Sequence, residues 1–207
     1  MELREALSQI SDIHRQMARG EVFRGYRSVT VGFSGMLALA AAAIQPLCMA
    51  STAEALERYL GLWIAVAAVS TTVAGLEMWW RAQATGSAMT RQMTRLAVQQ
   101  FLPSLVVGAL LTAAIYQYSR SVAWMLPGLW SLIFSLGIFA SHRLVPRPFF
   151  WVGVYYVVCG IGCLRWGQGA YAFSPWQMAV SFGGGQLMSA WILYWKLERT
   201  DDAQSKG

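Results

Sequence analysis

The sequence predicts an all-α integral membrane protein, a bundle of six transmembrane helices with an N-terminal amphipathic helix on the cytoplasmic side. Of its 207 residues, 56% are hydrophobic and 13% are charged, and the mean hydropathy is +0.42. Soluble domains carry about 25% charged residues, so this chain is too apolar to be one. Six apolar runs are each long enough to cross about 30 Å of hydrocarbon as a helix. They cover residues 29–49, 59–78, 101–118, 122–140, 148–164 and 176–195.

The distribution of basic residues between these runs predicts their orientation. Arginine and lysine gather before the first run, between the second and third, between the fourth and fifth, and after the sixth. The alternate connections hold one each, Arg58, Arg120 and Arg165. Because Lys and Arg accumulate in cytoplasmic loops, both termini are expected in the cytoplasm, in a plasma membrane or a bacterial inner membrane. The net charge of +6 then faces the anionic inner leaflet of the bilayer and does not indicate nucleic acid.

Residues 1–28 are predicted to form the cytoplasmic amphipathic helix and a membrane anchor. Apolar residues recur at helical spacing along one stripe, at Leu3, Leu7, Ile10 and Met17. The arginines of this segment are nearly balanced by acids, so it lacks the cationic face of a helix that binds lipid at the membrane surface. A contact with protein is therefore expected, either with a partner, by self-association, or with the bundle of the same chain.

Residues 81–100 are expected to lie on the cytoplasmic membrane surface. Three arginines occur there without any acid, and Met89, Met93 and Leu96 share one helical face, as in interfacial helices. The motif RQMTR at 91–95 repeats RQMAR at 15–19. The two copies drift out of step with the runs that follow them, so we interpret the likeness as coincidence and not as an internal repeat.

Two further features support the bundle. The connection at 119–121 is so short that the third and fourth runs must form an antiparallel hairpin. Aromatic residues gather at both predicted membrane boundaries, as in interfacial belts. Residues 29–196 are accordingly assigned to the membrane domain, and residues 197–207 to a disordered cytoplasmic tail.

One acid lies inside an apolar run. Glu77 is about 25 Å into the second run, close to the inner interface, and Arg81 follows one helical turn later. His142, at the inner end of the fourth run, would join them if the second and fourth runs pack together. This inner-face cluster is a hypothesis for a proton or cation relay. The alternative is a snorkelling ion pair that ends the helix, next to an ordinary interfacial histidine.

The sixth run is interrupted near the predicted membrane midplane by Gly183, Gly184, Gly185 and Gln186. Broken helices at this depth form binding sites or hinges in transporters. The competing interpretation is a smooth face on which another helix packs, with the glutamine bonding across it. Packing is slightly favoured, although three consecutive glycines weaken a helix more than packing requires.

The cysteines do not indicate a redox or metal centre. Cys48, Cys159 and Cys163 are expected to be buried apolar groups, and a disulfide between Cys48 and Cys163 is left open. No nucleotide loop, nucleophile elbow or zinc motif occurs in the sequence, so neither a cofactor nor a metal is expected.

Three functional classes remain. The first is a non-catalytic polytopic membrane protein that docks or regulates a partner through its cytoplasmic amphipathic helix. The second is a small transporter or channel for a neutral or weakly polar solute, with its midplane site at the glycine break. The third, an intramembrane enzyme, has the least support, because one carboxylate and one histidine do not make a convergent catalytic site.

Overall fold

The computed structural model describes residues 28–49, 55–84, 88–141 and 147–195, and all their regular elements are helices. The long ones are α2 Ser28–Cys48, α3 Ala55–Ala84, α4 Ala88–Tyr118, α5 Leu126–Ala140 and α6 Phe149–Trp166. Two short 3-10 helices, η2 Arg120–Met125 and η3 Gly169–Tyr171, lie in connections. The last helical run consists of α7 Pro175–Met178, the π-helical turn η4 Ala179–Gly184 and α8 Gly185–Leu193. The predicted N-terminal amphipathic helix and C-terminal tail lie outside the described residues.

Five stretches of helix are long and apolar enough to cross a membrane. They are Ser28–Cys48, Ala55–Trp80, Arg95–Tyr118, Arg120–Ala140 and Phe149–Trp166. They correspond to the first five predicted runs. The all-helical class and a set of membrane-compatible helices are therefore confirmed, while the sixth crossing stays a prediction. Its candidate is the run formed by α7, η4 and α8, whose helical segments follow one another without a coil residue between them.

The predicted surface helix over 81–100 is wrong in its boundaries. Residues from Ala88 onward belong to α4, which continues through Pro103 to Tyr118. No glycine occurs between Ala88 and Gly108, so nothing in this stretch except the proline favours a break. A proline inside a membrane helix is tolerated where neighbouring groups satisfy the carbonyl that it leaves free.

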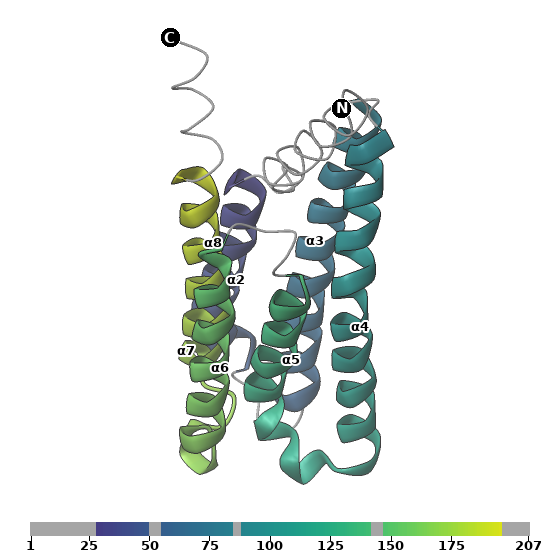
Figure 1. Ribbon diagram of the computed structural model, residues 1–207. Coiled ribbons are helices and arrows are strands. Elements are labelled where there is room, and N and C mark those ends of the chain that lie inside the picture. The colour runs from purple at the N-terminus through teal and green to yellow at the C-terminus, as the bar shows by residue number, and fades with distance from the viewer. Residues whose placement is uncertain (1–27, 50–54, 85–87, 142–146, 196–207) are drawn as a thin grey trace, which may run out of the picture.

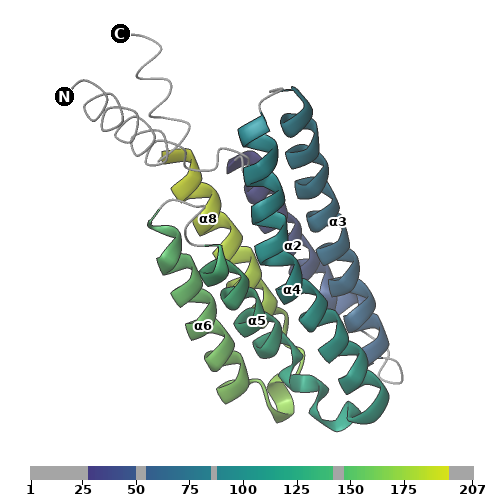
Figure 2. The same ribbon diagram turned by 45° about the vertical axis from the view of Figure 1, so that its right-hand side comes forward.

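The helices form a closed series of neighbours (Figures 1 and 2). α2 packs against α3 and α8, α4 packs against α3 and α5, and α6 packs against α5 and α8. The closest pairs are α5 with α6 and α2 with α8. Figure 1 shows that α2 begins at the same end of the bundle at which α8 ends. The first and last of the described helices are thus antiparallel neighbours, although they are far apart in the sequence.

α3 and α4 lie side by side at one edge of the bundle in both views (Figures 1 and 2). Only 17% and 11% of their apolar windows are buried, compared with 44% for Arg120–Ala140. Large apolar side chains on this pair are exposed, including Ile64, Leu76 and Leu110. A continuous apolar surface of this kind is unfavourable in water and is expected for a helix pair that faces lipid.

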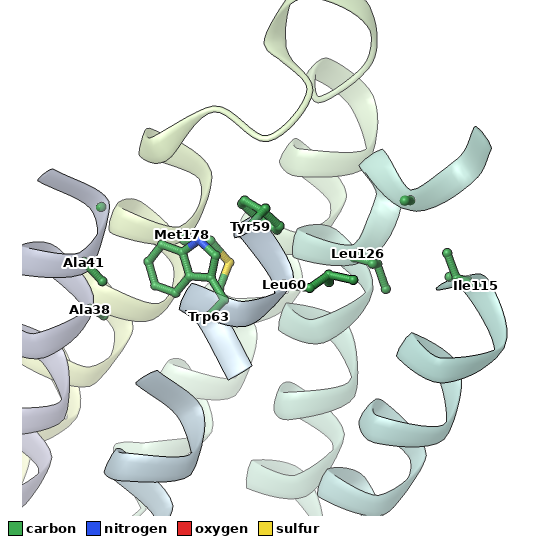
Figure 3. Packing of buried hydrophobic residues seen from close by; sticks show 10 residues of the cluster. Ala38, Ala41, Tyr59, Leu60, Trp63, Ile115, Leu126 and Met178 are labelled. Atoms are coloured by element: carbon green, nitrogen blue, oxygen red, sulfur yellow. The ribbon is translucent and has the colours of Figure 1, made fainter. Parts of the chain in front are cut away.

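A buried cluster joins the helices at the end of the bundle opposite the start of α2 (Figure 3). Tyr59 and Trp63 of α3 insert between the helices, and Tyr59 is 0% exposed. Its ring is stacked on that of Trp130 with centroids 6.3 Å apart, and lies 4.7 Å from the ring of Phe173. The small side chains of α2 leave room for these rings, since Ala38, Ala41 and Ala42 belong to the same cluster.

Candidate functional site

The predicted midplane residues lie where the π-helical turn η4 passes into α8. Gly183 and Gly184 end η4, while Gly185 and Gln186 begin α8. The chain stays helical through all four residues, so the glycines do not break the helix into two halves. Gly183 and Gly184 lie in a turn that is wound more widely, because a π-helical turn has one more residue per hydrogen-bonded ring than an α-helical turn.

The space beside each of the three glycines is occupied by a side chain from a neighbouring helix. A Cβ added to Gly183 would lie 2.6 Å from the Leu39 Cδ2 atom on α2. A Cβ on Gly184 would overlap the hydroxyl of Tyr155, and one on Gly185 would overlap the ring of Tyr156. Real Cβ atoms do not approach other atoms so closely. Close packing of α8 on α2 and α6 therefore accounts for the glycine run.

Tyr155 also satisfies the backbone of the π-helical turn. Its hydroxyl donates a hydrogen bond of 2.6 Å to the carbonyl oxygen of Val180, which lies in η4. A carbonyl without a partner costs several kcal/mol in hydrocarbon, and irregular winding exposes such groups. The phenol of α6 thus stabilises the altered turn that the glycines allow.

Gln186 and Tyr156 are the polar side chains that remain at this level. The Tyr156 hydroxyl is buried beside the side chain of Gln186 without completing a hydrogen bond to it. Tyr156 is 0% exposed and its ring packs on Phe134 and Phe182, with centroids 4.8 and 5.5 Å away. Tyr156 is thus held in an aromatic environment that resembles a packed core more than an open solute site.

Glu77 lies on α3 near the end at which α2 begins. Its carboxylate accepts a hydrogen bond from the hydroxyl of Thr30 on α2. α3 packs on α2 and α4, whereas α5, which precedes His142, packs mainly on α4 and α6. The structure therefore joins Glu77 to α2. The side chain of Arg81 and all of His142 lie outside the described residues, so the three-residue cluster stays a prediction.

A buried amide that the sequence reasoning missed holds three elements together. Gln45 of α2 is 1% exposed, and its Oε1 accepts a hydrogen bond of 3.0 Å from the Trp63 indole of α3. Its Nε2 donates a hydrogen bond of 2.6 Å to the carbonyl oxygen of Phe173. Phe173 has a φ of 57°, an unfavourable value for a bulky residue. The sequence feature that could have identified this residue is a single amide, Gln45, at the end of an alanine-rich apolar run.

Several buried hydroxyls bond within the bundle, although those of Tyr59 and Ser141 have no hydrogen-bond partner. Ser131, Ser181 and Ser189 each donate to the carbonyl four residues earlier in the same helix. Thr112 does the same and also accepts a hydrogen bond of 2.8 Å from the Trp130 indole. Such back-bonding satisfies a small polar side chain in an apolar interior and leaves no reactive hydroxyl.

An ion pair joins the first turn of α3 to η2. Arg120 lies 2.9 Å from Glu57 and stacks over the ring of Tyr116 at 4.2 Å. The three cysteines are free thiols, with Cys163 buried and Cys48 exposed. The disulfide that the sequence left open is therefore not formed in the structure.

Within the described residues, no group of three or more histidine, cysteine or acidic side chains is placed to hold a metal ion. The side chains of Gln45, Glu77 and Tyr155 there form hydrogen bonds between elements of the bundle. Comparison with protein-family models, with curated proteins and with solved structures gives no match for this chain.

Proposed function

We propose that this chain is a non-catalytic polytopic membrane protein that docks or regulates a partner through its cytoplasmic N-terminal segment. The observation that carries the proposal is the use of the buried polar groups. Gln45, Thr112 and the buried serines form their hydrogen bonds with groups of the same bundle. Such an interior serves as a rigid scaffold, and the chain must then act through its surfaces.

The N-terminal segment supplies the surface that favours a protein partner. Its apolar stripe contains Leu7 and Ile10, and acids offset its arginines. An amphipathic helix of this type fits an apolar groove of another protein better than an anionic lipid surface. The position of α2 is consistent with this role, since the segment leads directly into a helix anchored by α3 and α8.

The test is co-purification of the full chain from native membranes in mild detergent. Replacing Leu7 and Ile10 by serine should remove a specific co-purifying protein, while Gln9→Ser, which lies off the stripe, should retain it. The yield and melting temperature of the protein should be unchanged in both variants. The same set of co-purifying proteins in both variants and in the unaltered chain would contradict the proposal.

A second candidate, a small transporter or channel for a neutral or weakly polar solute, has one specific observation in its favour. The π-helical turn η4 lies within the last helical run, and such turns are frequent at functional sites. The packing of Leu39, Tyr155 and Tyr156 against the glycines argues for the scaffold instead. Solute flux into vesicles that contain the purified chain, lost in Gln186→Leu and kept in Gln117→Leu, would reverse this order.

A further inference from the structure

An apolar groove lies between the start of α6 and the end of α8. It has a volume of about 350 Å³, is open on one side, and is lined by Pro148, Trp191, Ile192 and Trp195. The indole rings of Trp191 and Trp195 lie 6.4 Å apart, centroid to centroid, at an angle of 70°. They form one wall of the groove, and Pro148 at the start of α6 contributes to the other.

The chemistry of the lining suits a lipid chain next to its headgroup. Trp191 is 65% exposed, so the indole is available to a ligand outside the bundle. Tryptophan prefers the boundary between hydrocarbon and headgroups, where its ring is apolar and its N–H is hydrated. The exposed rings of Phe150, Trp151 and Tyr194 lie in the same two helix ends and extend this boundary around the groove.

A basic residue adjoins the groove in the sequence. Arg147 directly precedes Pro148, is exposed, and has no ion pair or side-chain hydrogen bond within the described residues. The planar guanidinium presents its donors in a geometry that matches a phosphate group.

We propose that this groove binds one anionic phospholipid of the cytoplasmic leaflet, with an acyl chain along Trp191 and Ile192 and the phosphate beside Arg147. The assignment to this leaflet rests on the topology predicted from the basic residues. Lipids that merely surround the protein would show no headgroup preference that depends on Arg147 in particular. The groove instead combines an apolar lining with Arg147, the exposed residue that precedes Pro148, and a cation beside the phosphate would select for negative charge.

The experiment uses the full chain, purified in mild detergent and exchanged into an equimolar mixture of phosphatidylglycerol and phosphatidylcholine. Native mass spectrometry counts the lipids retained. We expect one phosphatidylglycerol to be kept in preference to phosphatidylcholine. Arg147→Gln should lower this preference about fivefold, because one basic residue near an anionic headgroup contributes on that order. Arg147→Lys, which keeps the charge, should retain most of it.

The opposite end of α6 provides matched controls. Arg165 is also exposed and lies beside an exposed tryptophan, Trp166, so Arg165→Gln should leave the preference unchanged. Trp191→Ala should reduce retention of both lipids, whereas Trp166→Ala, at a residue of similar exposure, should not.

Three results would overturn the proposal. They are equal retention of the two lipids by the unaltered chain, equal effects of Arg147→Gln and Arg165→Gln, and a lipid-free dimer that is lost in Trp191→Ala. The last would assign the groove to a second copy of the chain. No partner protein is present in this experiment, so its outcome is independent of the partner-docking proposal.

Discussion

Single residues decide how closely the helices approach one another. Gly184 and Gly185 accept the phenol groups of two consecutive tyrosines, and Gly183 accepts Leu39. Gly75 of α3, in contrast, has no atom within 4 Å of the position that a Cβ would take. The same residue type therefore has a packing role in α8 that it lacks in α3, and the two positions can be compared directly.

We expect Gly185→Ala to destabilise the protein by about 1–3 kcal/mol, because the added methyl group overlaps the ring of Tyr156. Gly75→Ala should leave the stability unchanged or raise it by up to about 1 kcal/mol, through helix propensity. Thermal unfolding of both variants in the same detergent measures the difference. Equal effects at the two glycines would show that α8 does not pack on α6 as described.

Gln45 provides a test of the buried amide. Gln45→Leu removes the acceptor of the Trp63 indole and leaves the Phe173 carbonyl without its donor. We expect a loss of about 1–3 kcal/mol in the free energy of unfolding. Gln117→Leu makes the same change at an exposed position and serves as the control. A blue shift of tryptophan fluorescence in the first variant alone would report the altered environment of Trp63.

Among the helical elements, the π-helical turn η4 is the most unusual. It places an irregular backbone in the last helical run, and α6 supplies the hydroxyl that satisfies it. α6 and the final run are thus joined by a hydrogen bond as well as by packing. The turn does not open a gap between the helices, because side chains occupy the space beside its glycines.

Tyr155→Phe isolates this hydrogen bond while keeping the ring. The Val180 carbonyl would lose its donor, and we expect a loss of about 0.5–2 kcal/mol in stability. Hydrogen exchange of the amides in 180–185 should become faster, since the turn is held less firmly. Tyr118→Phe, at a residue that is 83% exposed, should change neither quantity. An unchanged rate of hydrogen exchange in Tyr155→Phe would mean that the π-helical turn is stable without the hydrogen bond from Tyr155.

The molecule as a whole has two unequal parts. α2, α5, α6 and α8 are well packed, whereas α3 and α4 expose most of their apolar surface (Figures 1 and 2). Lipid would cover that surface without cost, because its chains are as apolar as the side chains they meet. The exposed apolar surface of α3 and α4 thus supports a membrane location more strongly than the mean hydropathy does. This surface is a property of the folded molecule, whereas the mean hydropathy describes only the composition.

An even number of crossings would place the connection between α4 and α5 opposite the C-terminal tail. In a chain with its three cysteines replaced by alanine, Ser119→Cys should react with an impermeant maleimide from outside the cell. Ser205→Cys should react only after the cells are permeabilised. Reaction of both sites in intact cells would exclude the predicted topology.

The helical class and the first five apolar runs were predictable, because length and apolar composition are local properties of the chain. The extent of α4 was not predictable, and the surface helix expected over 81–100 was wrong in its boundaries. Amphipathic patterning cannot show whether a helix continues into the next apolar run. For the candidate site, the sequence identified the glycines but not the residues that fill their space. Tyr155, Tyr156 and Leu39 lie on other helices, and their contacts depend on the rotation of each helix about its axis.

The sequence by itself therefore determined that the protein is helical and that it carries membrane-compatible apolar runs, because hydrophobic length is read along one dimension. Only the tertiary structure decided that α2 and α8 are neighbours, that Glu77 bonds to Thr30, and that the glycine run serves close packing. These facts depend on which helix faces meet, and in an apolar medium that choice is made by shape and by a few hydrogen bonds. Neither leaves a periodic signal in the sequence.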